Sequence, residues 1–310
     1  MLAQWVSQLG AAPGDGPMYE ANAANPRGLY ERRDIVDFND RWLTLLGGSW
    51  WAPPSVKAQT WRSIDPKELD KDRTMFDIFE PDQNGWFVKD PRLSLLLPLW
   101  DRLALQRLPV LIGLREPRDV AMSLNVRNGM TLRRGLALWA VYNREIFGHL
   151  AGRRSLVVDL TAGFEDPDSA VKAVAVFLSG QDLPVFDQHV DSTGAGVESY
   201  LRRHRCAELE GSAERLAKDL DEVYHALADR HLVEENGDSF DIPMPDWVCE
   251  TLDELTEFWD MKIRADILEG DLERLIEAYG QVKAELRDTL PRRAARAVVP
   301  PKVRNWVRGG

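Results

Sequence analysis

The sequence predicts an α/β fold with a parallel sheet, followed by a helical C-terminal extension. Three short apolar runs carry this prediction, at residues 85–88, 109–114 and 155–160. Each is typical of a buried strand and is followed by a turn and by apolar residues at the three-to-four spacing of a helix. Because strands that alternate with helices build parallel sheets, we expect neighbouring strand ends to meet at one crevice.

The predicted α/β domain covers residues 1–185. Residues 186–290 are expected to form a helical extension, with a helix at 212–231 and one or two more within 246–290. Apolar residues in the last stretch are spaced too irregularly to predict a clean heptad seam, although self-association through these helices is one expectation. Residues 291–310 are basic, and we expect either a flexible tail or a contact with an acidic partner or a membrane surface.

Composition and charge exclude several classes of protein. The chain has 310 residues with 39 basic and 50 acidic side chains, a net charge of −11, whereas a general nucleic-acid binder needs a basic surface. Its two cysteines, Cys206 and Cys249, form no CxxC pair or cluster with histidines, so we expect neither a disulfide framework nor a metal site. No apolar run of about twenty residues and no basic-then-apolar start are present. We therefore expect a cytoplasmic protein with neither a signal peptide nor a membrane span.

The stretch from 109 to 123 has the features of an anion site. Its strand ends at Arg115, a helix is expected to begin at Pro117, and Ser123 lies about two turns into that helix. The guanidinium offers a planar fork of donors, the helix start offers N–H groups and the serine offers a hydroxyl. A phosphate would be held from three sides. The alternative is an ordinary strand–helix turn in which Arg115 pairs with a neighbouring carboxylate.

A second strand end carries a similar arrangement. The run at 85–88 is followed by Lys89, Asp90 and Arg92, with a proline at the expected helix start. We expect Asp90 to orient Lys89, and Asp90 and Arg92 are candidates for contact with a substrate. The alternative for the two basic residues is a surface ion pair with Asp90 or Asp101. An anionic ligand needs a local basic pocket in an acidic protein, and the side chains that could form it are Lys89, Arg92, Arg115 and Arg118.

Arg115 and Ser123 stand eight residues apart, and in this the chain resembles sulfotransferases that use 3′-phosphoadenosine 5′-phosphosulfate (PAPS), in which such a pair grips the nucleotide's 3′-phosphate. Residues 25–31 and 138–143 are similar to elements of the bacterial members, and the resemblance fades beyond residue 185. It implies a three-layer fold of the P-loop type and a bacterial cytoplasmic enzyme with PAPS as co-substrate and no metal. The sulfuryl group would go to a hydroxyl or amine of a glycan, lipid or small metabolite.

The resemblance also implies roles for two side chains at the reaction centre. Lys89 corresponds to a lysine beside the transferred sulfuryl group. Glu31, just before a predicted helix capped by Asp34, corresponds to the carboxylate that takes the acceptor's proton. The alternative for Glu31 is an ion pair with Arg32 or Arg33 at the helix entry.

Trp50 and Trp51 lie in a stretch rich in tryptophan and proline, residues 49–63. Such a composition suits a loop folded over a cleft, where the two indoles would form a wall for the acceptor. The alternative is that these side chains fix the loop to the core.

One part of the family pattern is absent from the sequence. Members carry a loop of the type Gly-x-Pro-Arg-Ser-Gly-Thr-Ser, between a first strand and a helix, that cradles the 5′-phosphosulfate. Residues 2–9 here have the spacing of that helix, and the loop and its strand do not precede them. Either a start upstream of Met1 supplies both, or the chain is a catalytically inactive nucleotide-binding or interaction protein.

Overall fold

The computed structural model describes residues 1–20, 30–55, 60–61, 64–77, 85–180, 209–236 and 240–289. The chain divides into two compact units, Met1–Thr256 and Glu257–Gly310. The first unit therefore runs past residue 185, where the sequence predicted the end of the α/β domain, and the predicted tail at 291–310 lies outside the described residues. Among the described helices, none is long and apolar enough to cross a lipid bilayer.

The first unit contains a three-stranded sheet in the order β1-β2-β3. Strands β1 (Val110–Leu114) and β2 (Arg154–Asp159) are parallel, with Ile112 opposite Val157. A short third strand, β3 (Glu234–Asn236), runs antiparallel to β2. Two of the three predicted strands are therefore confirmed.

The prediction of a strand at 85–88 is wrong. Within the described residues, this segment forms a single parallel bridge from Trp86 to Ala12, outside the sheet. Phe87 nevertheless packs on the same apolar cluster as Leu111 of β1, which keeps the segment near the sheet. An apolar run shows that a segment is buried, but it does not show which backbone pairs with it.

Helices pack on both faces of the sheet. Ile112 and Val157 belong to one cluster with helices α6 (Pro117–Asn128), α7 (Leu132–Gly148), α10 (Gly211–Lys218) and α11 (Asp221–Ala228). Leu156 and Val158 belong to another cluster with helices α1 (Leu2–Gln8) and α9 (Pro167–Ser179). A short helix, α8 (Leu160–Glu165), links β2 to α9. The fold is thus mixed α/β and mostly helical, with a small parallel strand pair at its centre.

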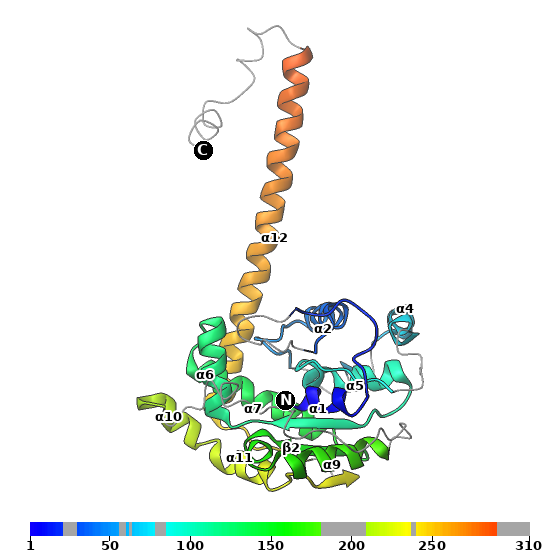
Figure 1. Ribbon diagram of the computed structural model, residues 1–310. Helices are drawn as coiled ribbons and strands as arrows, with labels where there is room; N and C mark the ends of the chain where they lie inside the picture. Colours follow the sequence, from blue (N-terminus) through cyan, green and yellow to red (C-terminus); the bar gives the residue numbers. More distant parts are fainter. Residues whose placement is uncertain are drawn as a thin grey trace. The chain divides into compact units, whose positions relative to one another are not determined.

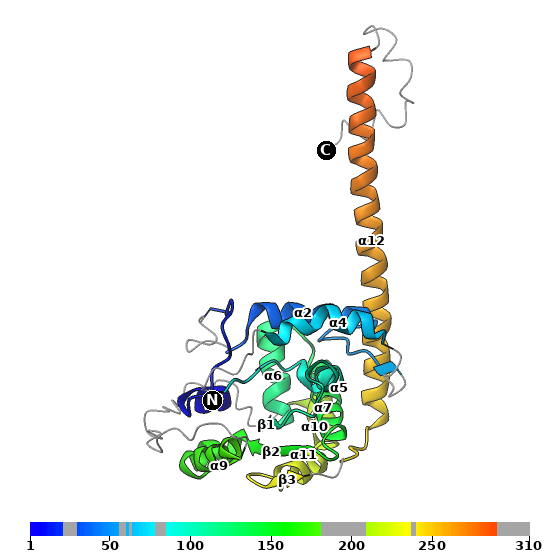
Figure 2. The same ribbon diagram turned by 90° about the vertical axis from the view of Figure 1, so that its right-hand side faces the viewer.

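A further cluster holds three helices around buried tryptophans. These helices are α2 (Arg33–Leu45), α4 (Pro66–Asp77) and α5 (Leu93–Ala104). Trp42, Trp61 and Trp100 are almost completely buried among them. Two views at right angles place α2 and α4 at the top of the first unit, with α9, α11 and β3 at the bottom (Figures 1 and 2).

Several predicted helices are confirmed, with corrections at their ends. The residue that caps α2 is Arg32, whereas the predicted cap, Asp34, accepts hydrogen bonds from the Arg32 guanidinium. The single helix predicted at 212–231 is two helices, α10 and α11, because the chain turns at Leu220 and buries this side chain completely. The stretch at 246–290 is one continuous helix, α12 (Asp246–Thr289).

Helices α6 and α7 approach each other closely at Gly135. A methyl group on Gly135 would lie 2.8 Å from the Cα atom of Ala121, which is backbone and cannot swing aside. We therefore expect Gly135→Ala to lower the free energy of unfolding by about 1 to 3 kcal/mol, although alanine favours helix by up to about 1 kcal/mol. In the same helix, Gly148 has open space around it, so Gly148→Ala is the control. Urea unfolding measures both, and a stabilised Gly135→Ala would contradict the close contact.

Candidate functional site

Arg115 follows directly on β1, as the sequence predicted. Its backbone carbonyl accepts a hydrogen bond from Trp139 Nε1 of α7 at 2.8 Å, which fixes the strand end against that helix. Its side chain is 41% exposed, and a carboxylate oxygen of Asp119 lies 4.0 Å from the guanidinium. Desolvation lowers the pKa of Arg115, while Asp119 and Glu116 oppose this effect. The positive charge is therefore only loosely neutralised.

The start of α6 differs from the prediction. Glu116 is the N-cap, and its carboxylate accepts a hydrogen bond from the backbone N–H of Asp119 at 3.0 Å. The expectation that a bound anion would meet open N–H groups here is therefore wrong in part, because the protein supplies its own carboxylate. Ser123 lies further along the same helix, half-buried, and its hydroxyl makes no hydrogen bond within the part of the chain that the structure describes.

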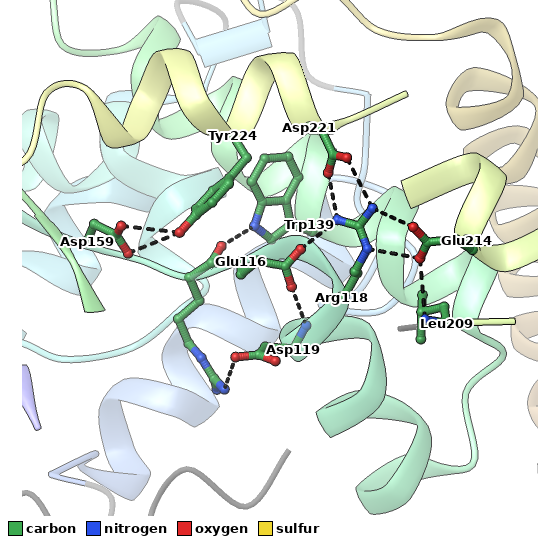
Figure 3. A network of polar contacts seen from close by, with 10 residues as sticks. Glu116, Arg118, Asp119, Trp139, Asp159, Leu209, Glu214, Asp221 and Tyr224 are labelled. Carbon is green, nitrogen blue, oxygen red and sulfur yellow. Dashed lines mark hydrogen bonds and ion pairs between the residues drawn. The ribbon is translucent and has the colours of Figure 1, made fainter. Parts of the chain in front are cut away.

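Arg118 points between helices toward three carboxylates (Figure 3). It lies 2.8 Å from Glu116, 3.0 Å from Glu214 of α10 and 2.6 Å from Asp221 of α11. The Asp221 and Glu214 carboxylates raise the pKa of Arg118, and Arg118 in turn lowers the pKa of Glu214. Arg118 therefore links α6 to α10 and α11 through ion pairs. Because three carboxylates neutralise its charge, the prediction that it belongs to a basic pocket is wrong.

At the end of β2, Asp159 and Tyr224 form a polar cluster that was not among the site residues predicted from the sequence. The hydroxyl of Tyr224, on α11, donates to the two carboxylate oxygens of Asp159 at 3.2 and 3.3 Å (Figure 3). Burial, together with the Asp159 charge, raises the pKa of Tyr224 to about 12. The Tyr224 ring also meets Trp139 edge to face at 6.5 Å. Asp159 could have been found from the sequence, because it is a carboxylate at the end of an apolar strand. Nothing in the sequence indicated that Tyr224 would be its partner.

Glu31 and Lys89, the two predicted catalytic residues, contact each other. Their side chains form an ion pair in which Glu31 is 13% exposed and Lys89 is 36% exposed. Of the alternatives expected from the sequence, the structure shows the pairing of Arg92 with Asp90, whereas Lys89 pairs with Glu31 and Arg32 pairs with Asp34. Just before Glu31, Tyr30 has a φ of 56°, a backbone conformation that few side chains adopt. This turn directs the chain into α2.

Asp90, next to Lys89 in the chain, is the buried centre of a polar network. Asn39 donates to its carboxylate at 2.8 Å, and the Arg92 guanidinium lies 3.0 Å from the other oxygen. Arg92 also makes two hydrogen bonds to Asp40, at 2.6 and 3.1 Å. The Asp90 side chain is fully buried. It therefore holds Arg92 and α2 in place, and the expectations of a contact with Lys89 and of a purely surface ion pair are not met in the described residues.

The two tryptophans of the predicted acceptor wall are both half-buried. Trp50 packs against the cluster of α2, α4 and α5, and its backbone carbonyl accepts a hydrogen bond from the Tyr142 hydroxyl at 2.7 Å. The packing agrees with a loop fixed to the core. A role in binding an acceptor stays a prediction for both residues.

The structure thus forms three groups from the predicted residues. Glu31 and Lys89 form one, Asp90 and Arg92 form another, and Arg115 and Ser123 share a single strand–helix unit. Among the described residues, no hydrogen bond or ion pair joins Arg115 or Ser123 to the other two groups. Of the four predicted basic residues, Arg115 has the loosest pairing with carboxylates.

The described residues include two surface hollows outside the predicted site. One surface hollow lies over α9 and β2 and includes Lys172 and Glu234, and another lies between α7 and α10 and includes Arg133 and Arg215. No cluster of three or more histidine, cysteine or acidic side chains suited to a metal ion occurs in the described ranges. In comparisons with known proteins, no family model, curated protein or solved structure matches the chain.

Proposed function

We propose that the protein is a sulfotransferase that moves a sulfuryl group from PAPS to a hydroxyl or amine of an acceptor. The observation that carries the proposal is Arg115, a loosely paired cation at the carboxyl end of β1 with Ser123 on the helix that follows. Ligands of parallel sheets bind at this edge. The acceptor class, a glycan, a lipid or a small metabolite, stays open.

The 3′-phosphate of the nucleotide is the group that Arg115 would bind. A phosphate at hydrogen-bond distance would replace the 4.0 Å approach of Asp119 with a much closer and doubly charged partner. Arg115 already bears the cost of partial desolvation, which lowers its pKa in the absence of a ligand. The Ser123 hydroxyl would add one weaker hydrogen bond.

The Glu31–Lys89 pair would supply the chemistry of transfer. The acceptor oxygen or nitrogen forms a bond to sulfur while the bond from sulfur to the bridging phosphate oxygen breaks, and that oxygen keeps the electron pair. The acceptor's proton passes to the Glu31 carboxylate. The Lys89 ammonium offsets negative charge on the leaving phosphate. Lys89 is the more exposed member of the pair, so it is the one that a ligand reaches first.

Glu116 favours a second candidate, a nucleotide-binding protein without transferase activity. Its carboxylate caps α6 and adds negative charge beside the site for the phosphate. Burial raises the pKa of Glu116 from its usual value, but a carboxylate here still opposes an anion more than open N–H groups would. Binding of the nucleotide without sulfate transfer to any acceptor would support this candidate.

The proposal predicts a selective loss on substitution of Arg115. Arg115→Ala should weaken binding of adenosine 3′,5′-bisphosphate by about tenfold to a hundredfold, the range of a charge-assisted hydrogen bond, and leave adenosine 5′-phosphate nearly unaffected. Ser123→Ala should lose less. Arg127→Ala, at an exposed arginine near the end of the same helix, is the matched control. Equal losses for both nucleotides, measured by calorimetric titration, would place Arg115 away from the 3′-phosphate.

A further inference from the structure

Helix α12 carries a regular apolar seam within the second unit. From Met261 onward, apolar or aromatic residues alternate at spacings of four and three, the heptad pattern of a coiled coil. These residues, which we call the α12 seam, are Met261, Ala265, Leu268, Leu272, Leu275, Tyr279 and Val282. Over the whole of 246–290 the apolar residues remain irregularly spaced, as the sequence predicted, and the regular spacing is confined to this stretch. Other apolar residues, such as Ile263 and Ile267, lie off the seam, and they make the heptad pattern hard to recognise in the sequence.

In the described part of the chain, all seam residues are exposed except Tyr279, which is half-buried. Met261 is 59% exposed, Leu268 and Leu275 are both 68% exposed, and Val282 is 52% exposed. At 1.5 Å per residue, the seam extends for about 30 Å along the helix. A row of large apolar side chains of this length is typical of a surface that binds another helix.

We propose that the α12 seam pairs with the same seam of a second copy in a parallel, in-register coiled coil. The charged residues at positions e and g, on either side of the seam, are the reason for choosing a second copy in parallel orientation. In a parallel pair, each residue at position g faces the partner's residue five positions later, at position e. Glu257 then faces the partner's Lys262, and Arg264 faces the partner's Glu269, so both contacts join opposite charges.

The antiparallel arrangement brings one pair of like charges together. When Leu272 packs against the partner's Leu275 in opposite directions, position e faces position e, and Lys262 meets the partner's Lys283. Like charges in contact oppose association. Lys262 pairs with Asp266 of its own helix at 2.6 Å, but both side chains are about half exposed, so this bridge is weak and can rearrange.

The helix also benefits from a partner. Gly270 and Gly280 lie inside α12 with open space around them, and each glycine weakens an isolated helix. Both lie off the seam, at positions that face away from a partner in a coiled coil. Pairing through the seam would stabilise a helix whose own residues favour it only weakly.

Sedimentation equilibrium of the full chain tests the proposal. The wild type should have twice the monomer mass of 35.2 kDa at micromolar concentration. Leu268→Lys should weaken the dimer by at least about a hundredfold, because it places a charge in the apolar seam of both copies. Ile267→Lys is the matched control, since Ile267 is a neighbouring apolar residue, 57% exposed, that lies off the seam. Leu275→Lys repeats the test at a second seam position.

A monomeric wild type, or equal weakening by Leu268→Lys and Ile267→Lys, would overturn the proposal. Charge reversal then tests the direction. Lys262→Glu should weaken a parallel dimer by roughly threefold to tenfold, and Glu257→Lys in the same chain should restore it. Stronger association of Lys262→Glu alone would show the antiparallel arrangement and contradict the proposal.

Discussion

Glu31→Gln is expected to lower the rate of sulfuryl transfer by about 10² to 10⁴, the contribution of a positioned general base. Glutamine keeps the size and hydrogen-bonding reach of the side chain but cannot accept the acceptor's proton. The ion pair with Lys89 is partly exposed, so its loss should cost the fold no more than about 1 kcal/mol. Nucleotide affinity should stay within about twofold, since the proposal assigns the 3′-phosphate to Arg115 and Ser123 and not to Glu31.

Asp37→Asn is the matched control for this change. It removes the same charge from an exposed position on α2, four residues before Arg41, and should leave turnover unchanged. The two variants are compared in sulfate-transfer assays and in thermal unfolding on the same preparations. Near-normal turnover of Glu31→Gln would show that another group takes the proton.

Arg118→Met is expected to lower the free energy of unfolding by about 2 to 4 kcal/mol. The change leaves the carboxylates of Glu116, Glu214 and Asp221 facing one another without their shared cation, and removal of one member of a buried pair typically costs about 3 to 5 kcal/mol. We expect less than the full amount because the three carboxylates are 22 to 34% exposed. Urea unfolding measures the difference.

The penalty should also depend on pH. Arg118 lowers the pKa of Glu214, so its contribution is present above the usual carboxyl value near 4.5 and is lost as the pH falls below it. The gap between Arg118→Met and the wild type should therefore shrink as the pH is lowered from 7 to 4. Arg73→Met, which breaks the exposed pair with Asp70 on α4, is the control and should have little effect at any pH. If the difference in unfolding free energy between Arg118→Met and the wild type stays constant with pH, the loss is caused by changed packing and not by the lost ion pairs.

Local chemistry made the strand–helix unit around Arg115 predictable. Pro117 occupies the first turn of α6, and Gly129 ends it in the left-handed conformation with a φ of 66°. The apolar run before Arg115 and the one before Leu160 indeed form parallel strands. Each of these features depends on residues only a few positions apart, so sequence patterns could find them.

Contacts between distant residues were not predictable in this way. Arg118 meets Glu214 and Asp221 across 96 and 103 positions, and Glu31 meets Lys89 across 58. For several of these charged residues, the sequence contains possible partners that are nearer along the chain. The observed partners of Arg118 are brought close by the packing of α10 and α11 against α7. The position of the 85–88 segment outside the sheet depends likewise on its bridge to Ala12, which an apolar pattern cannot reveal.

The central claim is that Arg115 and Ser123 recognise a 3′-phosphate, and calorimetric titration of the wild-type chain tests it most directly. Adenosine 3′,5′-bisphosphate and adenosine 5′-phosphate differ only in that group, so their affinities report its contribution. The account predicts that the bisphosphate binds more tightly by at least about tenfold, the value of one charge-assisted hydrogen bond. Equal affinity for the two nucleotides, or no binding of either, would contradict it.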